Sequence, residues 1–212
     1  MINLGNVFIL GDSYSTFGGF NPKGNNVWYY EGGHERTDVT KAEETWWNQL
    51  LKETESNLIL NESFSGSTVC NTERENIPHT SFVYRLNGLI KKGFFEKNKI
   101  DTFFIFGGTN DSWIDSPIGE KKYSDFTEED LKNVLPAFCY VISTLKNIIP
   151  NTKLIAVLNC DIKEEIISGF KEISEYFKIT VISLKEVEKQ NGHPNKAGMM
   201  QIKNQILNAL KN

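Results

Sequence analysis

Two segments of the chain carry side chains that could perform nucleophilic chemistry. In Gly11-Asp12-Ser13 a serine follows an apolar run, at a point where a glycine relieves crowding. A serine hydroxyl becomes a good nucleophile only when a neighbouring base accepts its proton, and a neutral imidazole is the usual base near neutral pH. His193, which follows Gly192, can supply that imidazole, and the other histidines, His34 and His79, lie in expected loops and could be polar surface residues. A serine with such a base would perform acyl transfer, although Asp and Ser are also common turn and N-cap residues.

Two further segments could stabilise the negative charge that such a reaction creates. Gly66 lies in the segment 61–67, where a glycine can present its backbone N–H to a bound oxyanion or can simply form a turn. Asn110 follows Gly107-Gly108-Thr109 and could donate its side-chain N–H to the same oxygen. Preorganised N–H donors at a developing oxyanion are worth roughly 3 to 4 kcal/mol each. We therefore expect removal of Asn110 to have a large effect.

These segments need a fold that brings distant parts of the chain together. Apolar, β-branched or aromatic runs of strand length occur at Val7–Leu10, Leu58–Leu60, Thr102–Phe106, Leu154–Leu158 and Ile179–Leu184. Between them, apolar residues recur at helical spacing, and the helix that contains Trp46 and Trp47 should face the core. This alternation predicts a parallel sheet covered by helices on both faces. Right-handed crossovers then place the carboxyl ends of all the strands at one edge, where ligand chemistry collects in such folds.

The sequence after His193 predicts a helix at the end of the chain. Apolar residues recur at helical spacing from Met199 to Leu210. Proline suits the first helical position, so Pro194 should begin the helix and His193 should lie just before it.

Two connections are longer than the roughly 2 to 6 residues usual in α/β proteins. They run from about residue 16 to 41 and from about 112 to 126. Because long loops at the active edge are often functional, we expect both to form walls of a substrate pocket. The alternative is a surface elaboration whose aromatic residues cover the core. The residues expected to contact substrate are Asp12, Tyr14, Trp28, Tyr29 and Trp113.

Composition limits the classes of protein that need to be considered. With 212 residues, 39% of them hydrophobic and 24% charged, residues 1–212 should fold as one α/β domain. A formal net charge of -4 argues against a general nucleic-acid surface. Three scattered cysteines without C-x-x-C spacing suggest reduced structural thiols, with no disulfide framework and no zinc site.

The start of the chain and its apolar runs indicate where in the cell the protein should be found. The first five residues lack a basic segment and a long apolar run, and no stretch reaches the roughly 18 to 20 apolar residues of a membrane span. We expect a soluble, cytoplasmic protein, although a signal peptide that had been removed would leave the same sequence.

Taken together, the four motifs resemble the sequence blocks of the SGNH (GDSL) hydrolases. Gly11-Asp12-Ser13, Gly66, the segment 108–111 and a late His193 occur in the family's order, and the resemblance spans nearly the whole chain. It implies a flavodoxin-like, three-layer α/β/α sandwich with about five parallel strands, and esterase, lipase, thioesterase or carbohydrate-deacetylase activity. By position it implies that Ser13 is the nucleophile, that His193 is the base, and that the N–H groups of Ser13, Gly66 and the Asn110 side chain form the oxyanion hole. It implies no metal and no organic cofactor.

One position departs from the family pattern. Much of the family has an aspartate three residues before the histidine, and this chain has Gln190 there. Loss of the orienting carboxylate lowers turnover by roughly ten-thousand-fold in serine proteases, so another group must orient the ring if the chain is an efficient catalyst. Our preferred hypothesis is that a backbone carbonyl near Gln190, or its side-chain oxygen, accepts the imidazole N–H. A second is that Glu188 reaches the ring, and a third is that the protein binds its ligand without rapid turnover.

The loops favour a small substrate. Neither presents the wide apolar surface of a lipase lid, and their mixture of aromatic, polar and glycine residues suits a small or sugar-borne acetyl ester. A general short-chain esterase, thioesterase or lipase remains an alternative, as does a non-catalytic ligand-binding domain. A flavin or nucleotide binder would need a phosphate-binding loop after the first strand, which residues 11–16 could imitate. The acyl and leaving groups and the oligomeric state are left open.

Overall fold

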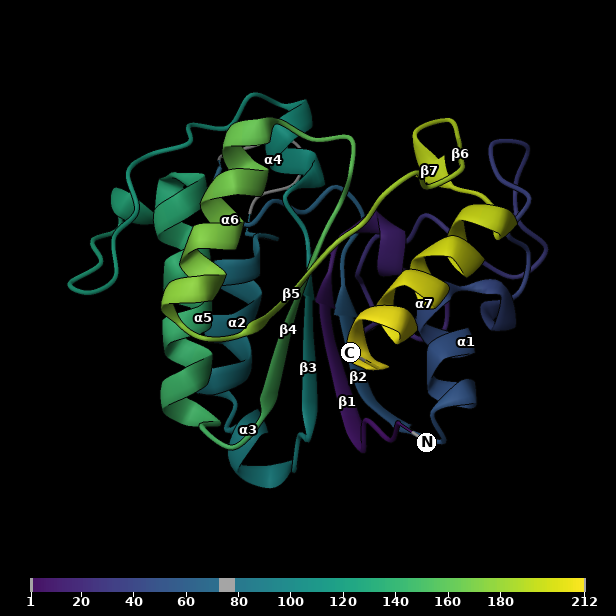
Figure 1. Cartoon of the computed structure of the whole chain (residues 1–212), viewed down its shortest axis with the longest axis horizontal. Helices are drawn as coiled ribbons and strands as arrows, with labels where there is room; N and C mark the ends of the chain where they lie inside the picture. Colours follow the sequence, from purple (N-terminus) through teal and green to yellow (C-terminus); the bar gives the residue numbers. More distant parts are fainter. Residues whose placement is uncertain (1, 73–78, 212) are drawn as a thin grey trace.

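Five parallel strands form the centre of the molecule, in the order β2-β1-β3-β4-β5 (Figure 1). The structure is a computed structural model that describes residues 2–72 and 79–211. The strands are β1 (Asn6–Gly11), β2 (Asn57–Ser63), β3 (Thr102–Phe106), β4 (Lys153–Leu158) and β5 (Thr180–Ser183). Every neighbouring pair runs parallel. Each strand coincides with one of the five apolar runs, so the predicted parallel sheet is confirmed.

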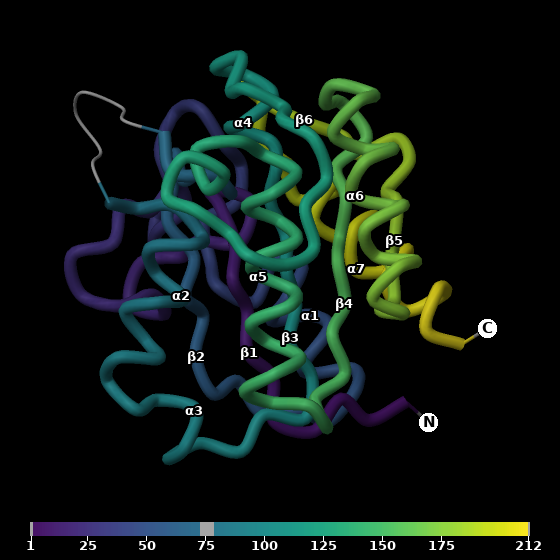
Figure 2. The backbone as a smooth tube through the Cα atoms, turned by 90° about the vertical axis from the view of Figure 1, so that its left-hand side faces the viewer, coloured from purple at the N-terminus to yellow at the C-terminus, as the bar shows by residue number. Residues whose placement is uncertain are grey.

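Helices cover both faces of the sheet and complete the predicted three-layer α/β/α sandwich (Figures 1 and 2). One layer contains α2 (Phe82–Lys91), α3 (Phe94–Lys97), α5 (Val134–Ile148) and α6 (Glu164–Tyr176). The other contains α1 (Trp46–Glu53) and α7 (Lys196–Lys211). Shorter helical segments are η1 (Ser13–Ser15), η2 (Ala42–Glu44), α4 (Thr109–Trp113) and η3 (Asp130–Lys132).

The central strands are buried on both faces because their side chains alternate between two hydrophobic cores. In β1, Phe8 and Leu10 pack with the layer of α2, α3, α5 and α6. Val7 and Ile9 face α1 and α7 on the other side. Trp46 and Trp47 of α1 are almost completely buried in this second core, as their helical spacing predicted.

The segment around His193 differs in detail from the prediction. His193 lies outside the helix, as expected, but His193–Pro194 forms the short strand β7, which pairs antiparallel with β6 (Lys189–Gln190). Helix α7 begins only at Lys196, where the side chain of Asn195 accepts the Gly198 N–H at 2.8 Å. The prediction that Pro194 is the first helical residue was therefore wrong, because a side-chain cap one residue later begins the helix.

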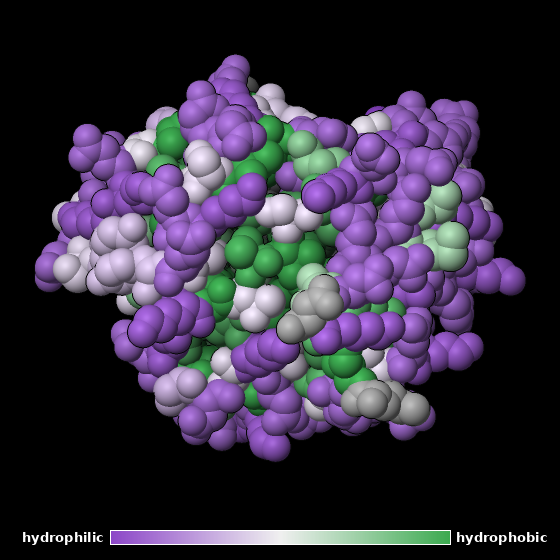
Figure 3. Space-filling model, viewed as in Figure 1, coloured by the Kyte–Doolittle hydropathy of each residue, from purple (hydrophilic) through white to green (hydrophobic). Residues whose placement is uncertain are grey.

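The view of Figure 3 shows polar side chains over the helices and apolar side chains near the middle of this face, between the two helical layers. Figure 2 shows that both chain ends lie on the same side of the molecule. Within the described residues, no helix combines the length and the apolar character that crossing a bilayer requires.

Candidate active site

Ser13 lies where β1 leaves the sheet and turns into η1. A Cβ atom on Gly11 would lie 2.5 Å from the Ser63 hydroxyl oxygen, so the chain can approach β2 this closely only with glycine there. The Asp12 carboxyl group then caps the turn by accepting the Tyr14 N–H at 3.0 Å. Ser13 is only 2% exposed. Its position is therefore set by the local chain, at the carboxyl edge of the sheet.

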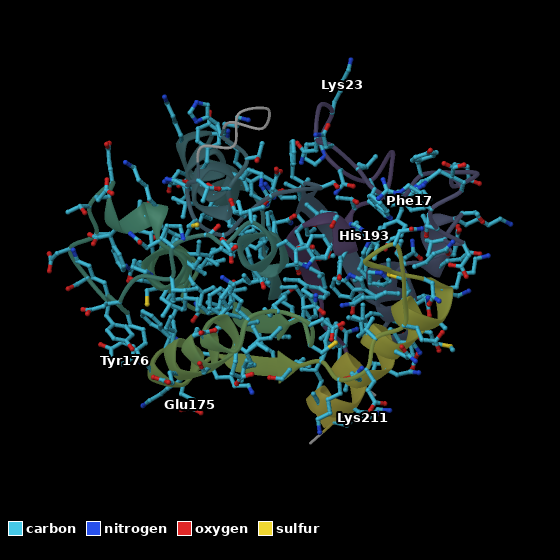
Figure 4. The ribbon with its side chains drawn as sticks, turned by 90° about the horizontal axis from the view of Figure 1, so that it is seen from above. Phe17, Lys23, Glu175, Tyr176, His193 and Lys211 are labelled. Carbon is cyan, nitrogen blue, oxygen red and sulfur yellow. The ribbon has the colours of Figure 1, made fainter. Side chains whose placement is uncertain are left out.

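His193 comes from the far end of the sequence and meets Ser13 at this edge. Its Nε2 lies 3.0 Å from the Ser13 hydroxyl oxygen, and its Nδ1 lies 3.1 Å from the backbone oxygen of Asn191. Because a carbonyl oxygen only accepts hydrogen bonds, the neutral ring carries its proton on Nδ1 and turns the Nε2 lone pair toward Ser13. Figure 4 shows His193 in the interior of the view from above, where the C-terminal segment meets the N-terminal part of the chain.

Burial changes the acid–base behaviour of this imidazole. His193 is 6% exposed, and burial lowers its pKa to about 4 because the charged form loses hydration. The hydrogen bond to Asn191 opposes this effect, and the positive charges of Arg36 and Lys189 add to it. The ring is therefore neutral, and able to accept a proton, throughout the neutral range.

Two buried tyrosines hold the backbone on either side of His193. The Tyr14 hydroxyl donates to the Gly192 carbonyl at 2.7 Å, and the Tyr29 hydroxyl donates to the Pro194 carbonyl at 2.8 Å. Both tyrosines, like Asp12, are fully buried. Their side chains lie inside the protein and support the backbone of the site, and contact of Asp12, Tyr14 and Tyr29 with substrate stays a prediction.

The two groups outside η1 that are expected to form the oxyanion hole follow the strands on either side of β1. Gly66 follows β2 and adopts a φ of 89°, which favours glycine. Asn110 follows β3 and donates from Nδ2 to the Ser67 carbonyl at 2.9 Å. The Asp111 carboxylate accepts the Val69 N–H at 2.9 Å. These bonds attach the loop that contains Gly66 to the end of β3, and the strand order β2-β1-β3 puts both segments beside Ser13.

Neither side chain proposed to replace the missing aspartate contacts the imidazole. Gln190 pairs with His193 through the backbone ladder of β6 and β7. The Glu188 carboxylate accepts hydrogen bonds from Asn195 and Gln201, each at 3.5 Å, on the side of α7. The atom beside Nδ1 is the carbonyl of Asn191, one residue after Gln190.

Two tryptophans lie beside His193, Trp28 from the first long loop and Trp113 from the end of α4. The indole of Trp28 stacks on the imidazole with centroids 3.6 Å apart and an interplanar angle of 7°. The Arg36 guanidinium carbon lies 4.5 Å from the centroid of the same indole. Since the imidazole fills one face at this distance, Arg36 must occupy the other. Neither face of the indole is therefore open, and contact between Trp28 and substrate stays a prediction.

Trp113 remains as an accessible aromatic wall. It is 49% exposed and stands edge-on to His193, with ring centroids 5.8 Å apart and an interplanar angle of 77°. A surface cavity of about 520 Å³ adjoins Trp28. It is lined by Val27, Trp28, Tyr30, His34, Glu35 and Arg36. The first long loop thus lies at the site, whereas Ile118, Tyr123 and Phe126 of the second pack against the core of the α2, α3, α5 and α6 layer.

Arg85 of α2 belongs to the same network and was missed by the sequence analysis. Its guanidinium donates to the carbonyl of Gly11 at 3.0 Å, to the Ser67 hydroxyl at 2.7 Å, to the Thr80 carbonyl at 2.8 Å and to the Glu62 carbonyl. Burial lowers its pKa to about 10. A signal was present in the sequence, because Arg85 falls on the same helical face as the apolar Phe82, Leu86 and Leu89.

In residues 2–72 and 79–211, no three His, Cys, Asp or Glu side chains are grouped to bind a metal ion.

The chain is similar to known proteins over almost its full length. A family model described as GDSL-like lipase/acylhydrolase matches residues 5–210. A solved structure titled "putative GDSL-like lipase" from Bacteroides ovatus is 38% identical, with a TM-score of 0.90 over 99% of each chain. One with the same title from Bacteroides uniformis is also 38% identical, with a TM-score of 0.88 over 98% of this chain and 95% of that chain.

More distant structures share the fold. An acetyl xylan esterase from the rumen bacterium Butyrivibrio proteoclasticus is 15% identical, with a TM-score of 0.62 over 100% of this chain and 65% of that chain. No curated protein sequence matches the chain.

Proposed function

The chain belongs to the GDSL-like lipase/acylhydrolase family and is a hydrolase that acts on esters, and from this premise we propose that Ser13 is its nucleophile and His193 its general base. The observation that carries the proposal is the distance of 3.0 Å between the Ser13 hydroxyl oxygen and Nε2 of His193. That distance is within the range over which a base can accept the hydroxyl proton. The bond from Nδ1 to the Asn191 carbonyl supports it, because it leaves Nε2 as the unprotonated nitrogen.

The reaction then proceeds through an acyl-enzyme. His193 Nε2 accepts the Ser13 proton while the hydroxyl oxygen bonds to the ester carbonyl carbon, and a tetrahedral oxyanion forms. The imidazolium returns that proton to the departing alkoxide, which leaves as the alcohol. Water then attacks the acyl-serine with His193 again as base, and the acid is released.

The oxyanion would be held by the N–H groups of Ser13, Gly66 and Asn110. The Asn110 amide nitrogen carries two hydrogens, and one of them is used on the Ser67 carbonyl. The second is left for the oxyanion. The same hydrogen bond attaches the Gly66 loop to Asn110, so two of the three donors are fixed relative to each other before substrate binds, which is the condition for electrostatic stabilisation.

For the substrate, we propose a small or carbohydrate-borne acetyl ester. The half-exposed indole of Trp113 beside His193 offers a flat surface on which a sugar ring could stack. Structures that share this fold include the acetyl xylan esterase from Butyrivibrio proteoclasticus. A short-chain acyl ester or thioester is the second candidate, and Trp113 would then be only a pocket wall.

A fluorophosphonate probe tests the catalytic pair. We expect labelling of the wild-type protein and loss of labelling in Ser13→Ala and His193→Ala. Hydrolysis of acetylated sugars should then be compared with that of nitrophenyl esters of short and long acids. Trp113→Ala should raise KM for acetylated sugars and leave KM for nitrophenyl acetate unchanged. Unchanged labelling of Ser13→Ala would contradict the proposed nucleophile, and equal KM changes for both substrates would contradict sugar stacking.

A further inference from the structure

We propose that Trp28, supported from behind by Arg36, is the positioning residue that orients His193 in place of a triad carboxylate. The inference rests on the proposed roles of Ser13 and His193. Trp28 does not act on the substrate in this proposal. It acts through the imidazole, whose ring plane it determines.

The two hydrogen bonds of the imidazole leave one rotation unrestrained. Nε2 faces Ser13, and Nδ1 faces the carbonyl of Asn191. Both contacts lie near the ring plane, so the ring can tilt about the line that joins its nitrogens at little cost in hydrogen-bond geometry. The acceptor at Nδ1 is also a neutral carbonyl from the same turn, and hydrogen bonds to neutral acceptors are weaker than those to carboxylates. A further contact is needed to keep the lone pair of Nε2 directed at the serine hydroxyl.

The stacked indole supplies that contact. An interplanar angle of 7° and a centroid distance of 3.6 Å mean that any tilt of the imidazole drives it into the indole or opens a gap. Arg36 on the opposite face keeps the indole from moving away. The Asn191 side chain also donates to the Arg36 carbonyl at 3.0 Å, so the turn that contains the Nδ1 acceptor is attached to the residue behind the indole.

Trp28 is itself attached to the nucleophile. The Thr16 hydroxyl donates to the Ser13 carbonyl at 2.9 Å and accepts the Trp28 N–H at 2.8 Å. The contacts therefore form a closed ring, which runs from Ser13 through Thr16 and Trp28 to His193 and back to Ser13. In such a ring the base and the nucleophile are positioned by one set of contacts, so loss of the stack should change their alignment.

The charges around the imidazole provide a second readout. The charged and titratable groups that face it are Arg36 and His34 from the long loop and Lys189 from β6, with Tyr14 from η1 below. The charge of Arg36 helps to lower the pKa of His193. Removal of that charge should therefore raise the pH at which the base becomes protonated, by about half a pH unit for an exposed cation.

The experiment compares Trp28→Leu, Trp28→Phe and Arg36→Gln with wild type on nitrophenyl acetate, and measures kcat, KM and the acid limb of the pH profile. Misalignment of about 1 Å can cost on the order of 100-fold in rate. We expect Trp28→Leu to lower kcat by about 30- to 100-fold with KM nearly unchanged, and Trp28→Phe to restore most of the loss. Arg36→Gln should shift the acid limb upward by about half a pH unit. Phe20→Leu, which removes an exposed aromatic ring of the same loop that packs on Trp47, is the matched control and should change none of these values.

Ser13→Ala separates this inference from the proposed function. If Ser13→Ala is inactive while Trp28→Leu retains wild-type kcat and acid limb, the inference is wrong and the proposed function stands. If Ser13→Ala retains activity, the proposed function is wrong and the inference fails with it. If Trp28→Leu does not fold, the surface variant Arg36→Gln decides, because it removes the support behind the indole, and a kcat equal to that of wild type would overturn the proposal.

Discussion

Replacement of Arg85 by methionine should destabilise the protein and impair the reaction, because this guanidinium joins the ends of β1 and β2 to the loop that contains Gly66. Arg85 is only 7% exposed, and its four hydrogen bonds go to three backbone carbonyls and one hydroxyl. Methionine replaces the aliphatic part of the side chain and leaves these acceptors without the donor.

The size of the effect follows from the acceptors that are left behind. Removal of one partner from a buried charged network costs about 3 to 5 kcal/mol, because the remaining polar groups stay buried without their donor. We therefore expect the free energy of unfolding to fall by about 3 kcal/mol, and kcat of the folded variant to fall at least about tenfold because Gly11 and Ser67 are no longer held together.

The free energy can be measured by urea denaturation with tryptophan fluorescence, and kcat with nitrophenyl acetate. Lys132→Met, which removes an exposed charge paired with Glu129, is the control and should change both values little. Arg85→Lys should be intermediate, because one ammonium group cannot reach four acceptors in a fixed planar arrangement. A loss below about 1 kcal/mol in Arg85→Met, with full activity, would refute the view that this guanidinium holds the strand ends together.

Three further predictions concern single groups of the site. Since burial lowers the pKa of His193 to about 4, kcat/KM for an activated ester should stay flat as the pH falls to about 5 and reach half its value near pH 4; a midpoint near 6.5 would contradict the buried, neutral imidazole. Asn110→Ala should lower kcat by about 100- to 1000-fold with little change in KM, and a loss under about threefold would show that this amide does not contact the oxyanion. Burial raises the pKa of Asp12 from 3.8 to about 7. Between about pH 4 and 7 the folded chain therefore keeps a proton that the unfolded chain has lost. The free energy of unfolding of the wild type should fall as the pH rises from about 4 to 7 and then level off. Asp12→Asn should remove this dependence, so that its free energy of unfolding, measured by denaturation, gains up to about 4 kcal/mol relative to wild type between pH 4 and 8. Identical pH dependence in both proteins would count against a buried carboxyl group that holds a proton.

Some features of the site could have been predicted from sequence and others could not. Arg85 stands on the apolar face of α2, so helical periodicity marks it as a buried charge that needs partners. The partners themselves could not be predicted, because Gly11, Glu62 and Ser67 are separated from Arg85 by 18 to 74 residues. The burial of Tyr14 and Tyr29 was missed for a related reason. A loop sequence has no periodicity, so nothing in it shows which aromatic rings face the core.

Sequence by itself determined the five strands, the two helical layers and the order in which the motifs reach one edge of the sheet, because apolar periodicity and the handedness of crossovers are properties of local segments. Only the tertiary structure decided what surrounds His193. The carbonyl of Asn191, the indole of Trp28 and the hydroxyls of Tyr14 and Tyr29 come from separate parts of the chain, and their contacts depend on side-chain packing between those parts. Gln190 in place of an aspartate made a backbone carbonyl one candidate partner for the ring, but carbonyls are present at every residue, so the sequence could not select that of Asn191.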